Sequence, residues 1–463
     1  MVLLGRCPFL FARWVRGVLY WAVVSLSPIA VALDLGGAYE AALTQDSGIR
    51  AARAAAEAGR ERLPQARSQW LPNVSLSASR NKNKLDASAP NSFGVAQNSQ
   101  SDYFSSNQSL TLRQTLFNKV KSADFDQAGY QVADAEALLA RELQNLATRV
   151  SEAYFGALMA EDQLALLRSQ ETLVRTQLDA AQKTFTAGAG TRTDIDEVQA
   201  RLDLNTAQLL EAQQNVDYAR QQLSVLINQP VQQLAALDLA RLNLLPPSPA
   251  TLAQWIVLAD QNSPEIKTLE ARQEAARLQI DKSRAGHLPT LDVVAQWSIS
   301  SSENVTSLNS SYDTRSVGVQ LSVPLYAGGY VNSTMRQALA EHVHAVETLE
   351  ATRRDLGLRV HKEFRGVTEG VLRVKALEQA VRSAEQAVIS SRKSAQAGVR
   401  TQLDVLKADA QKMESMRDLA QARYVYLLSK LRLAALAGLA MHESIHEINT
   451  YLSVTDHGES AHP

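Results

Sequence analysis

The sequence contains the same long pattern twice, about 210 residues apart, and this repetition constrains the fold more than any other feature. The segment GAGTRTD at 188–194 returns as GVRTQLD at 398–404, and Leu71-Pro72 returns as Leu288-Pro289. A duplication of this length repeats a whole supersecondary unit, and each half packs against its copy. The architecture can therefore be predicted from one repeat and checked against the other.

The start of the chain is typical of a secretory signal peptide. Three arginines precede an apolar run over 17–31, and Ala30-Val31-Ala32 forms an A-x-A cleavage site. The alternative is an uncleaved membrane anchor, but that needs about 20 apolar residues and this run is shorter. We therefore expect a signal peptide over 1–32 and a mature chain that begins at Leu33.

Cysteine content and net charge exclude several classes of function. The single cysteine, Cys7, lies inside the expected signal peptide, so the mature chain would have no disulfide, no thiol nucleophile and no cysteine metal site. The formal net charge is -1 at pH 7, so no basic excess points to a nucleic-acid partner. Charged or amide residues interrupt every later apolar run, so a membrane could be crossed only by strands.

Each repeat is expected to begin with a helix, over 35–69 in the first copy, and to continue into a β-hairpin. Apolar residues alternate with polar ones from Val74 to Ala78 and again over 110–117, separated by a Ser/Asn-rich stretch at 80–108 that we expect to be a long exposed loop. In the second repeat the strands are expected over 293–300 and 316–323, around a polar loop at 301–315. This dyad pattern is typical of outer-membrane barrels, although a half-buried soluble hairpin would also show it.

A long coiled-coil helix is expected after each hairpin. Apolar or small residues recur every three or four positions from Leu139 to Leu167, and the second repeat keeps this phase over 349–377. No proline interrupts the chain from Leu116 to Gln229, and a helix over 119–186 would be about 100 Å long. Each long helix should end at the Gly-x-x-Thr-x-x-Asp turn, from which a second helix returns. The expected units are a first repeat at 33–229, a linker at 230–262, a second repeat at 263–440 and a tail at 441–463.

These features together resemble the TolC family of outer-membrane channel proteins. The resemblance rests on the paired Gly-x-x-Thr-x-x-Asp turns, on Leu71-Pro72 and Leu288-Pro289, and on the segment 324–329 (PLYAGG). It implies a mainly α fold with a membrane β-barrel portion, in which long coiled-coil helices form an α-barrel. Four strands of each chain would join a shared 12-stranded barrel in a homotrimer, since four strands alone leave open edges.

The resemblance also implies a location and partners. The channel would lie in the outer membrane of a Gram-negative bacterium, in contact with its lipid, and extend into the periplasm. It would work with a periplasmic adaptor and with an inner-membrane ABC transporter or proton-driven pump. We expect the exit duct of a type I secretion system that exports a protein, such as an RTX-type toxin. The alternatives are a multidrug efflux duct and, from another class, a soluble periplasmic coiled-coil scaffold.

The two turns hold the candidate functional residues. Gly188 and Gly398 stand where a helix C-terminus favours a left-handed residue, Thr191 and Thr401 where an N-cap is needed, and Asp194 and Asp404 at the third helical position. Capping alone would explain this spacing. The resemblance adds that Asp404 would ring a constriction of the periplasmic entrance, and that Arg400 would bridge to Asp194 and lock it.

The chain departs from the family pattern at two positions near this constriction. Lys407 occupies the place of a second ring aspartate, and Ala395 occupies the place of a lock tyrosine. Lys407 could pair with Asp404 at i,i+3 and weaken the negative ring. We therefore expect looser closure and weaker cation selectivity than the family pattern implies.

The segment His442-Glu443-Ser444-Ile445-His446 matches the zinc-protease pattern H-E-x-x-H. That chemistry needs a third ligand and a substrate cleft, and few residues follow His446. No phosphate loop, Ser/His/Asp arrangement or pair of catalytic carboxylates stands out. We therefore expect no enzyme activity, no metal and no cofactor.

Overall fold

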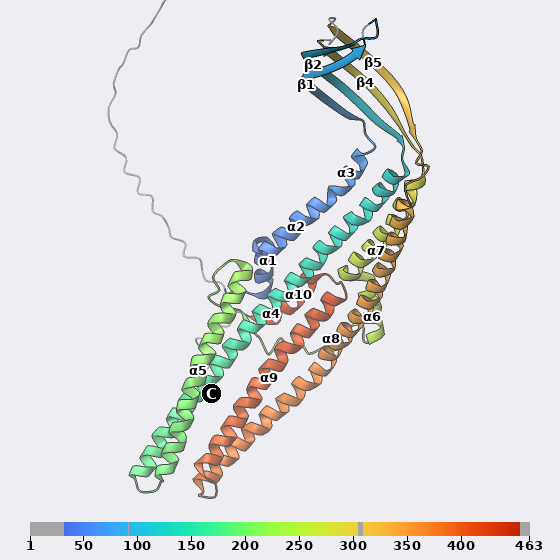
Figure 1. Cartoon of the computed structure of the whole chain (residues 1–463). Helices are drawn as coiled ribbons and strands as arrows, with labels where there is room; N and C mark the ends of the chain where they lie inside the picture. Colours follow the sequence, from blue (N-terminus) through green and yellow to red (C-terminus); the bar gives the residue numbers. More distant parts are fainter. Residues whose placement is uncertain (1–31, 91, 304–308, 454–463) are drawn as a thin grey trace, which may run out of the picture.

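The computed structural model describes residues 32–90, 92–303 and 309–453. Apart from Ala32, the expected signal peptide lies outside these residues, and so does the end of the expected tail. The molecule is elongated: a body of long helices carries a β-sheet at one end and ends in two helical hairpins at the other (Figure 1). In the described ranges, no helix combines the length and the apolar character needed to cross a membrane.

The first repeat runs from short helices through a hairpin into two long helices. Helices α1 (Leu35–Gln45), α2 (Ser47–Arg60) and α3 (Arg62–Ser68) replace the single helix that we expected over 35–69. Asp46 causes the first break, since its side chain accepts the Ile49 N–H as the N-cap of α2. Strands β1 (Asn73–Pro90) and β2 (Ala96–Phe117) follow, and then α4 (Lys119–Thr186) and α5 (Arg192–Ile227).

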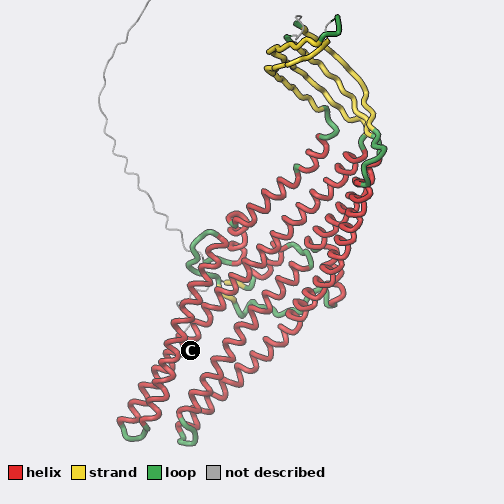
Figure 2. The backbone as a smooth tube through the Cα atoms, viewed as in Figure 1, coloured by secondary structure: helices red, strands yellow, loops and turns green. Residues whose placement is uncertain are grey.

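The second repeat has the same order after a linker. Its elements are α6 (Leu252–Asn262), α7 (Pro264–Arg284), the 3-10 turn η1 (Ala285–His287), β4 (Thr290–Ser302), β5 (Ser310–Ser322), α8 (Tyr330–Gln396), α9 (Gln402–Leu436) and α10 (Met441–Asn449). The short strands β3 (Ala236–Leu237) and β6 (Leu452–Ser453) pair with each other and tie the linker to the end of the second repeat. Figure 2 shows how strands and helices separate along the molecule.

The main hydrophobic core lies in the middle of the helical body, where α4, α8 and α9 meet the shorter helices. Its centre is aromatic: Tyr154 and Phe155 of α4 are fully buried, and the Phe155 ring lies 5.8 Å from the ring of Tyr424 on α9. Heptad positions such as Leu146, Val150 and Val360 are buried as well. Towards the hairpin tips only small apolar clusters remain, so the two helical pairs are held there by fewer contacts.

The four long strands form one antiparallel sheet in the order β1-β2-β4-β5. Our expectation of a long loop over 80–108 is wrong, because β1 and β2 pair continuously from Asn73↔Arg113 to Pro90↔Ala96. The loop expected at 301–315 is also too long, since β4 reaches Ser302 and β5 begins at Ser310. These segments carry few large apolar side chains because they have no core to cover. Their backbones still form a ladder, and Ser77 and Ser109 hydrogen-bond across it at 2.7 Å.

Candidate functional site

The sheet has two chemically different faces, because successive side chains of a strand point to opposite sides. One transverse row is apolar: Val74, Leu112, Ala295 and Val317. The adjacent row, on the other face, is polar: Ser75, Thr111, Gln296 and Ser316. Val317 is 80% exposed although it is apolar, so the apolar face is uncovered within one chain. Such a sheet can separate a hydrocarbon phase from an aqueous one.

The polar face also carries an ion pair near the helical body. Arg113 of β2 donates to the Asp292 carboxylate of β4, with an N–O distance of 2.7 Å. Both outer strands, β1 and β5, keep one edge without a strand partner among the described residues. One segment of a water-filled barrel requires a polar face lined by charges, an apolar opposite face and two open edges, and this sheet has all three.

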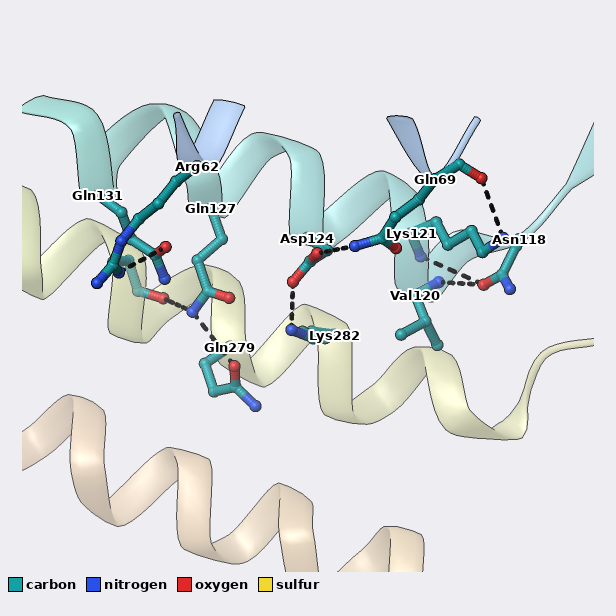
Figure 3. A network of polar contacts seen from close by, with 11 residues as sticks. Arg62, Gln69, Asn118, Val120, Lys121, Asp124, Gln127, Gln131, Gln279 and Lys282 are labelled. Atoms are coloured by element: carbon teal, nitrogen blue, oxygen red, sulfur yellow. Dashed lines mark hydrogen bonds and ion pairs between the residues drawn. The ribbon is translucent and has the colours of Figure 1, made fainter. Parts of the chain in front are cut away.

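A polar network joins α3, α4 and α7 at their ends next to the sheet (Figure 3). Its centre is Asp124 of α4, which accepts hydrogen bonds from Lys282 of α7 and, at 2.8 Å, from Gln69 at the end of α3. Lys121 adds bonds to the Gln69 carbonyl and to the Thr115 hydroxyl of β2. Partial burial raises the pKa of the Asp124 carboxyl, but the hydrogen bonds and the charge of Lys282 outweigh it and hold the pKa below its usual value.

The two Gly-x-x-Thr-x-x-Asp turns lie at the same end of the molecule, opposite the sheet (Figure 1). Gly188 and Gly398 adopt φ values of 75° and 74°, the left-handed conformation that ends α4 and α8. The Gly188 N–H bonds to the Phe185 carbonyl and the Ala189 N–H to the Thr184 carbonyl, which is a Schellman motif. An added Cβ would meet no atom within 4 Å at either glycine, so the backbone angle rather than lack of space favours glycine.

A capping box begins each returning helix. The Thr191 hydroxyl accepts the Asp194 N–H, and the Asp194 carboxylate accepts the Thr191 N–H at 3.0 Å; Thr401 and Asp404 repeat this arrangement. The hydrogen bond from the Thr191 hydroxyl is the main reason that the pKa of Asp194 lies below its usual value. At Asp404 the Thr401 N–H lowers the pKa most, and the charges of Arg400 and Lys407 lower it further. Both carboxylates therefore remain charged in moderately acidic solution.

Arg400 and Lys407 do not form ion pairs with these carboxylates within the described part of one chain. Arg400 instead donates to the buried Ser391 hydroxyl of α8 at 2.8 Å. Lys407 lines a hollow of about 740 Å³ between α5 and α9, together with Arg201 and Glu414. The structure thus brings Arg400, Asp404 and Lys407 to one turn, while Asp194 stands on the neighbouring hairpin.

Sequence reasoning missed a polar link just inside the tips. Asp409 of α9 is 7% exposed, and it accepts hydrogen bonds from Gln177 of α4 at 2.9 Å and from Arg392 of α8 at 3.1 Å. The signal was present, because Asp409 follows the buried Val405 and Leu406 on the face of α9 that should be apolar. A carboxylate at such a position needs partners from neighbouring helices.

The H-E-x-x-H segment forms α10, whose buried residues are Met441, Ile445 and Ile448, while His442 and His446 are exposed. Within the described residues, no three His, Cys, Asp or Glu side chains are grouped so that they could hold a metal ion. The helix packs by its apolar residues.

Comparisons with known proteins agree with this geometry. The family model described as "Outer membrane efflux protein" matches residues 38–229 and 255–439, one segment in each repeat. The alkaline protease secretion protein AprF of Pseudomonas aeruginosa is 34% identical, over 89% of this chain and 85% of its own. The proteases secretion protein PrtF of Dickeya chrysanthemi is 31% identical, over 94% of each. The crystal structure of the outer membrane protein VceC from Vibrio cholerae superposes with a TM-score of 0.74 at 20% identity, over 88% of this chain and 96% of that one.

These matches confirm the expected fold class, a helical barrel with a β-domain, and place the chain in the outer membrane with a periplasmic extension. The protein is a transport channel and not an enzyme. Since the family model covers most of both repeats, the chain belongs to the TolC family of outer membrane efflux proteins.

Proposed function

We propose that this channel is the exit duct of a type I secretion system and that its cargo is a protein. The observation that carries the proposal is that AprF and PrtF, both named for protease secretion, align with 89% and 94% of the chain. A secreted protease or an RTX-type toxin would then pass from the inner-membrane transporter outward through the lumen. Membership of a channel family argues against the alternative of a soluble scaffold.

The proposed active form is a homotrimer. One chain contributes four strands with free edges at β1 and β5, and such edges are not tolerated in hydrocarbon. Pairing of β5 in one copy with β1 in the next would give twelve strands from three copies. The apolar row that includes Val74 and Val317 would then face lipid all round, and the polar row would face the lumen.

The proposed partners are a periplasmic adaptor and an inner-membrane ABC transporter. They would meet the channel at the helical tips, which lie opposite the sheet and therefore at its periplasmic end (Figure 1). The tips also hold the proposed entrance constriction, formed by Asp404 and Lys407. Arg400 donates one N–H to Ser391 in its own chain, so a lock between Arg400 and Asp194, within the chain or across the trimer, would use its other N–H groups or replace that bond. An exposed ion pair of this kind contributes about 0–1 kcal/mol, so the lock would bias closure only weakly.

A deletion strain separates protein secretion from drug efflux. We expect the extracellular proteome of the deletion strain to lack one or a few proteins, and the wild-type gene to restore them. Sensitivity to dyes and antibiotics should stay close to that of the parent strain. An unchanged extracellular proteome together with a large gain in drug sensitivity would show instead a multidrug efflux duct with a proton-driven pump.

A further inference from the structure

On β4 the outward face of the sheet changes from apolar to polar within one row of residues. On β5 the change comes earlier, because Arg315 and Asp313 stand in the rows of Trp297 and Ile299. On β4 the apolar face carries Val293, Ala295, Trp297 and Ile299, and the next residue on that face is Ser301. The row through Ser301 continues to Ser106 of β2 and Arg80 of β1 on one side, and to Ser311 of β5 on the other. With about 3.3 Å per residue, this row lies just beyond the apolar band, at the level of the outer-leaflet headgroups.

A hollow of about 600 Å³ lies at this level. Its lining includes hydroxyl groups of Ser106, Ser301 and Ser311 and the amide of Gln108, all on the face that carries the apolar band. The hydroxyls of Ser106 and Ser301 lie 2.7 Å apart and hydrogen-bond to each other. The volume falls within the roughly 300–1,000 Å³ of small-ligand sites, and hydroxyl and amide groups suit a ligand that is itself rich in hydroxyls.

One cation is positioned at this hollow. The Arg80 guanidinium stacks on the Phe104 ring at 5.1 Å from its centroid, and in the described residues Arg80 has no ion-pair partner. A stacked guanidinium keeps its donors free for a phosphate, which it can bind in a bidentate manner. Glu303 also borders the hollow, but its carboxylate accepts the Phe104 N–H at 3.1 Å and so is fixed to the strand.

We propose that this hollow binds the phosphorylated sugar headgroup of an outer-leaflet glycolipid. The Arg80 guanidinium binds the phosphate, while the Ser106, Ser301 and Gln108 side chains bind sugar hydroxyls. The acyl chains then lie along the apolar band below, next to Leu76, Leu110 and Trp297. This inference rests on the sheet and its place in the outer membrane, and it holds whichever cargo the channel exports.

The test uses the full-length channel, purified in a zwitterionic detergent, and native mass spectrometry with bis-phosphorylated lipid A as the probe. We expect Arg80→Gln to weaken retention of this lipid by about tenfold, as for a lost charge-assisted hydrogen bond. Enzymatic dephosphorylation of the lipid should weaken binding to the unmodified channel by a similar factor. With the dephosphorylated lipid, Arg80→Gln should then have no further effect.

Two variants control for general charge effects. Arg315 also stacks on a ring, that of Trp297 at 5.6 Å, but it pairs with Asp313 and does not line the hollow, so Arg315→Gln should change retention by less than about twofold. Glu303→Gln removes a carboxylate beside the phosphate and should leave retention unchanged or increase it.

Three outcomes would overturn the proposal. The unmodified channel and Arg80→Gln could retain the phosphorylated lipid equally, or Arg80→Gln and Arg315→Gln could lose retention of it equally. Phosphatidylglycerol could also displace lipid A from the unmodified channel as strongly as lipid A itself does. If Arg80→Gln changes the thermal unfolding of the channel, the comparison of the two lipids on the unmodified protein still decides the question.

Discussion

Gln177 on α4 donates a hydrogen bond to Asp409 on α9 at 2.9 Å. The two residues are 232 positions apart in the chain, so this bond joins helices from different repeats. Asp409 also pairs with Arg392 of α8, so one buried carboxylate connects the two helical pairs of the chain. The apolar clusters nearby are small, and Val174, Val198, Leu202 and Leu406 form the one around this level. Leu406 of α9 belongs to this cluster, so the relative position of the two pairs near the tips depends on one small apolar contact and on this polar link.

Asp409→Asn should loosen the tips. The variant leaves Arg392 without its ionic partner and weakens the bond from Gln177, at a cost of about 1–3 kcal/mol for a buried polar group that loses a partner. We expect a larger single-channel conductance in planar bilayers and faster hydrogen exchange over 170–180 and 405–412. Asp196→Asn is the matched control, because among the described residues Asp196 makes only an exposed i,i+4 pair with Arg192. Equal conductance in Asp409→Asn and the unmodified channel would contradict a role for this link in closure.

The charge at the entrance should depend on Asp404 and Lys407 in opposite ways. If both line the constriction, Asp404→Asn lowers the preference for cations over anions, and Lys407→Asp raises it, because each change alters the same ring by one or two charges per chain. Reversal potentials in a KCl gradient measure this preference. An unchanged reversal potential in Asp404→Asn would remove Asp404 from the constriction.

The preference for cations over anions should persist in acid. The Thr401 N–H and hydroxyl, followed by the charges of Arg400 and Lys407, hold the pKa of Asp404 below its ordinary value of 3.8. The carboxylate therefore remains charged as the pH falls to that value and is neutralised only below it. We expect cation preference to be constant from pH 7 to about pH 4 and to fall at lower pH. In Thr401→Ala the pKa of Asp404 should return towards its ordinary value. The cation preference should then begin to fall at a higher pH than in the unmodified channel.

The capping box of α5 can be tested apart from any role in the entrance. Thr191→Ala removes the hydroxyl that accepts the Asp194 N–H and donates to its carboxylate, which should cost about 1 kcal/mol of local helix stability. Hydrogen exchange should become faster at residues 191–196, while Thr191→Ser should keep the unmodified rate. An effect of the serine variant as large as that of alanine would show that the methyl group, not the cap, matters.

The sequence predicts the helices better than the strand ends, and the reason is physical. The heptad phase from Leu139 to Leu167 and the absence of proline determine a long helix, since each turn repeats the same burial requirement. Strand ends beyond the membrane have no such requirement, so residues 80–108 look like a loop although their backbones pair. Periodicity places Asp409 on the buried face of α9, but it does not show which helices will be neighbours, so the partners Gln177 and Arg392 could not be predicted.

The joint between sheet and helices gives a last prediction, centred on Asp124. Its pKa is lowered in the folded protein, mainly by the hydrogen bonds of Lys282 and Gln69 acting against partial burial. A lowered folded-state pKa means that the stabilisation is present above the unfolded-state pKa and is lost as the pH falls through the folded-state pKa. Asp124→Asn should therefore lower the thermal unfolding temperature at pH 7 and make it less sensitive to pH below about 4. Asp126→Asn, on the exposed side of the same turn, should behave like the unmodified channel at both pH values. If Asp124→Asn unfolds at the same temperature as the unmodified channel at pH 7, the network in Figure 3 does not stabilise the joint.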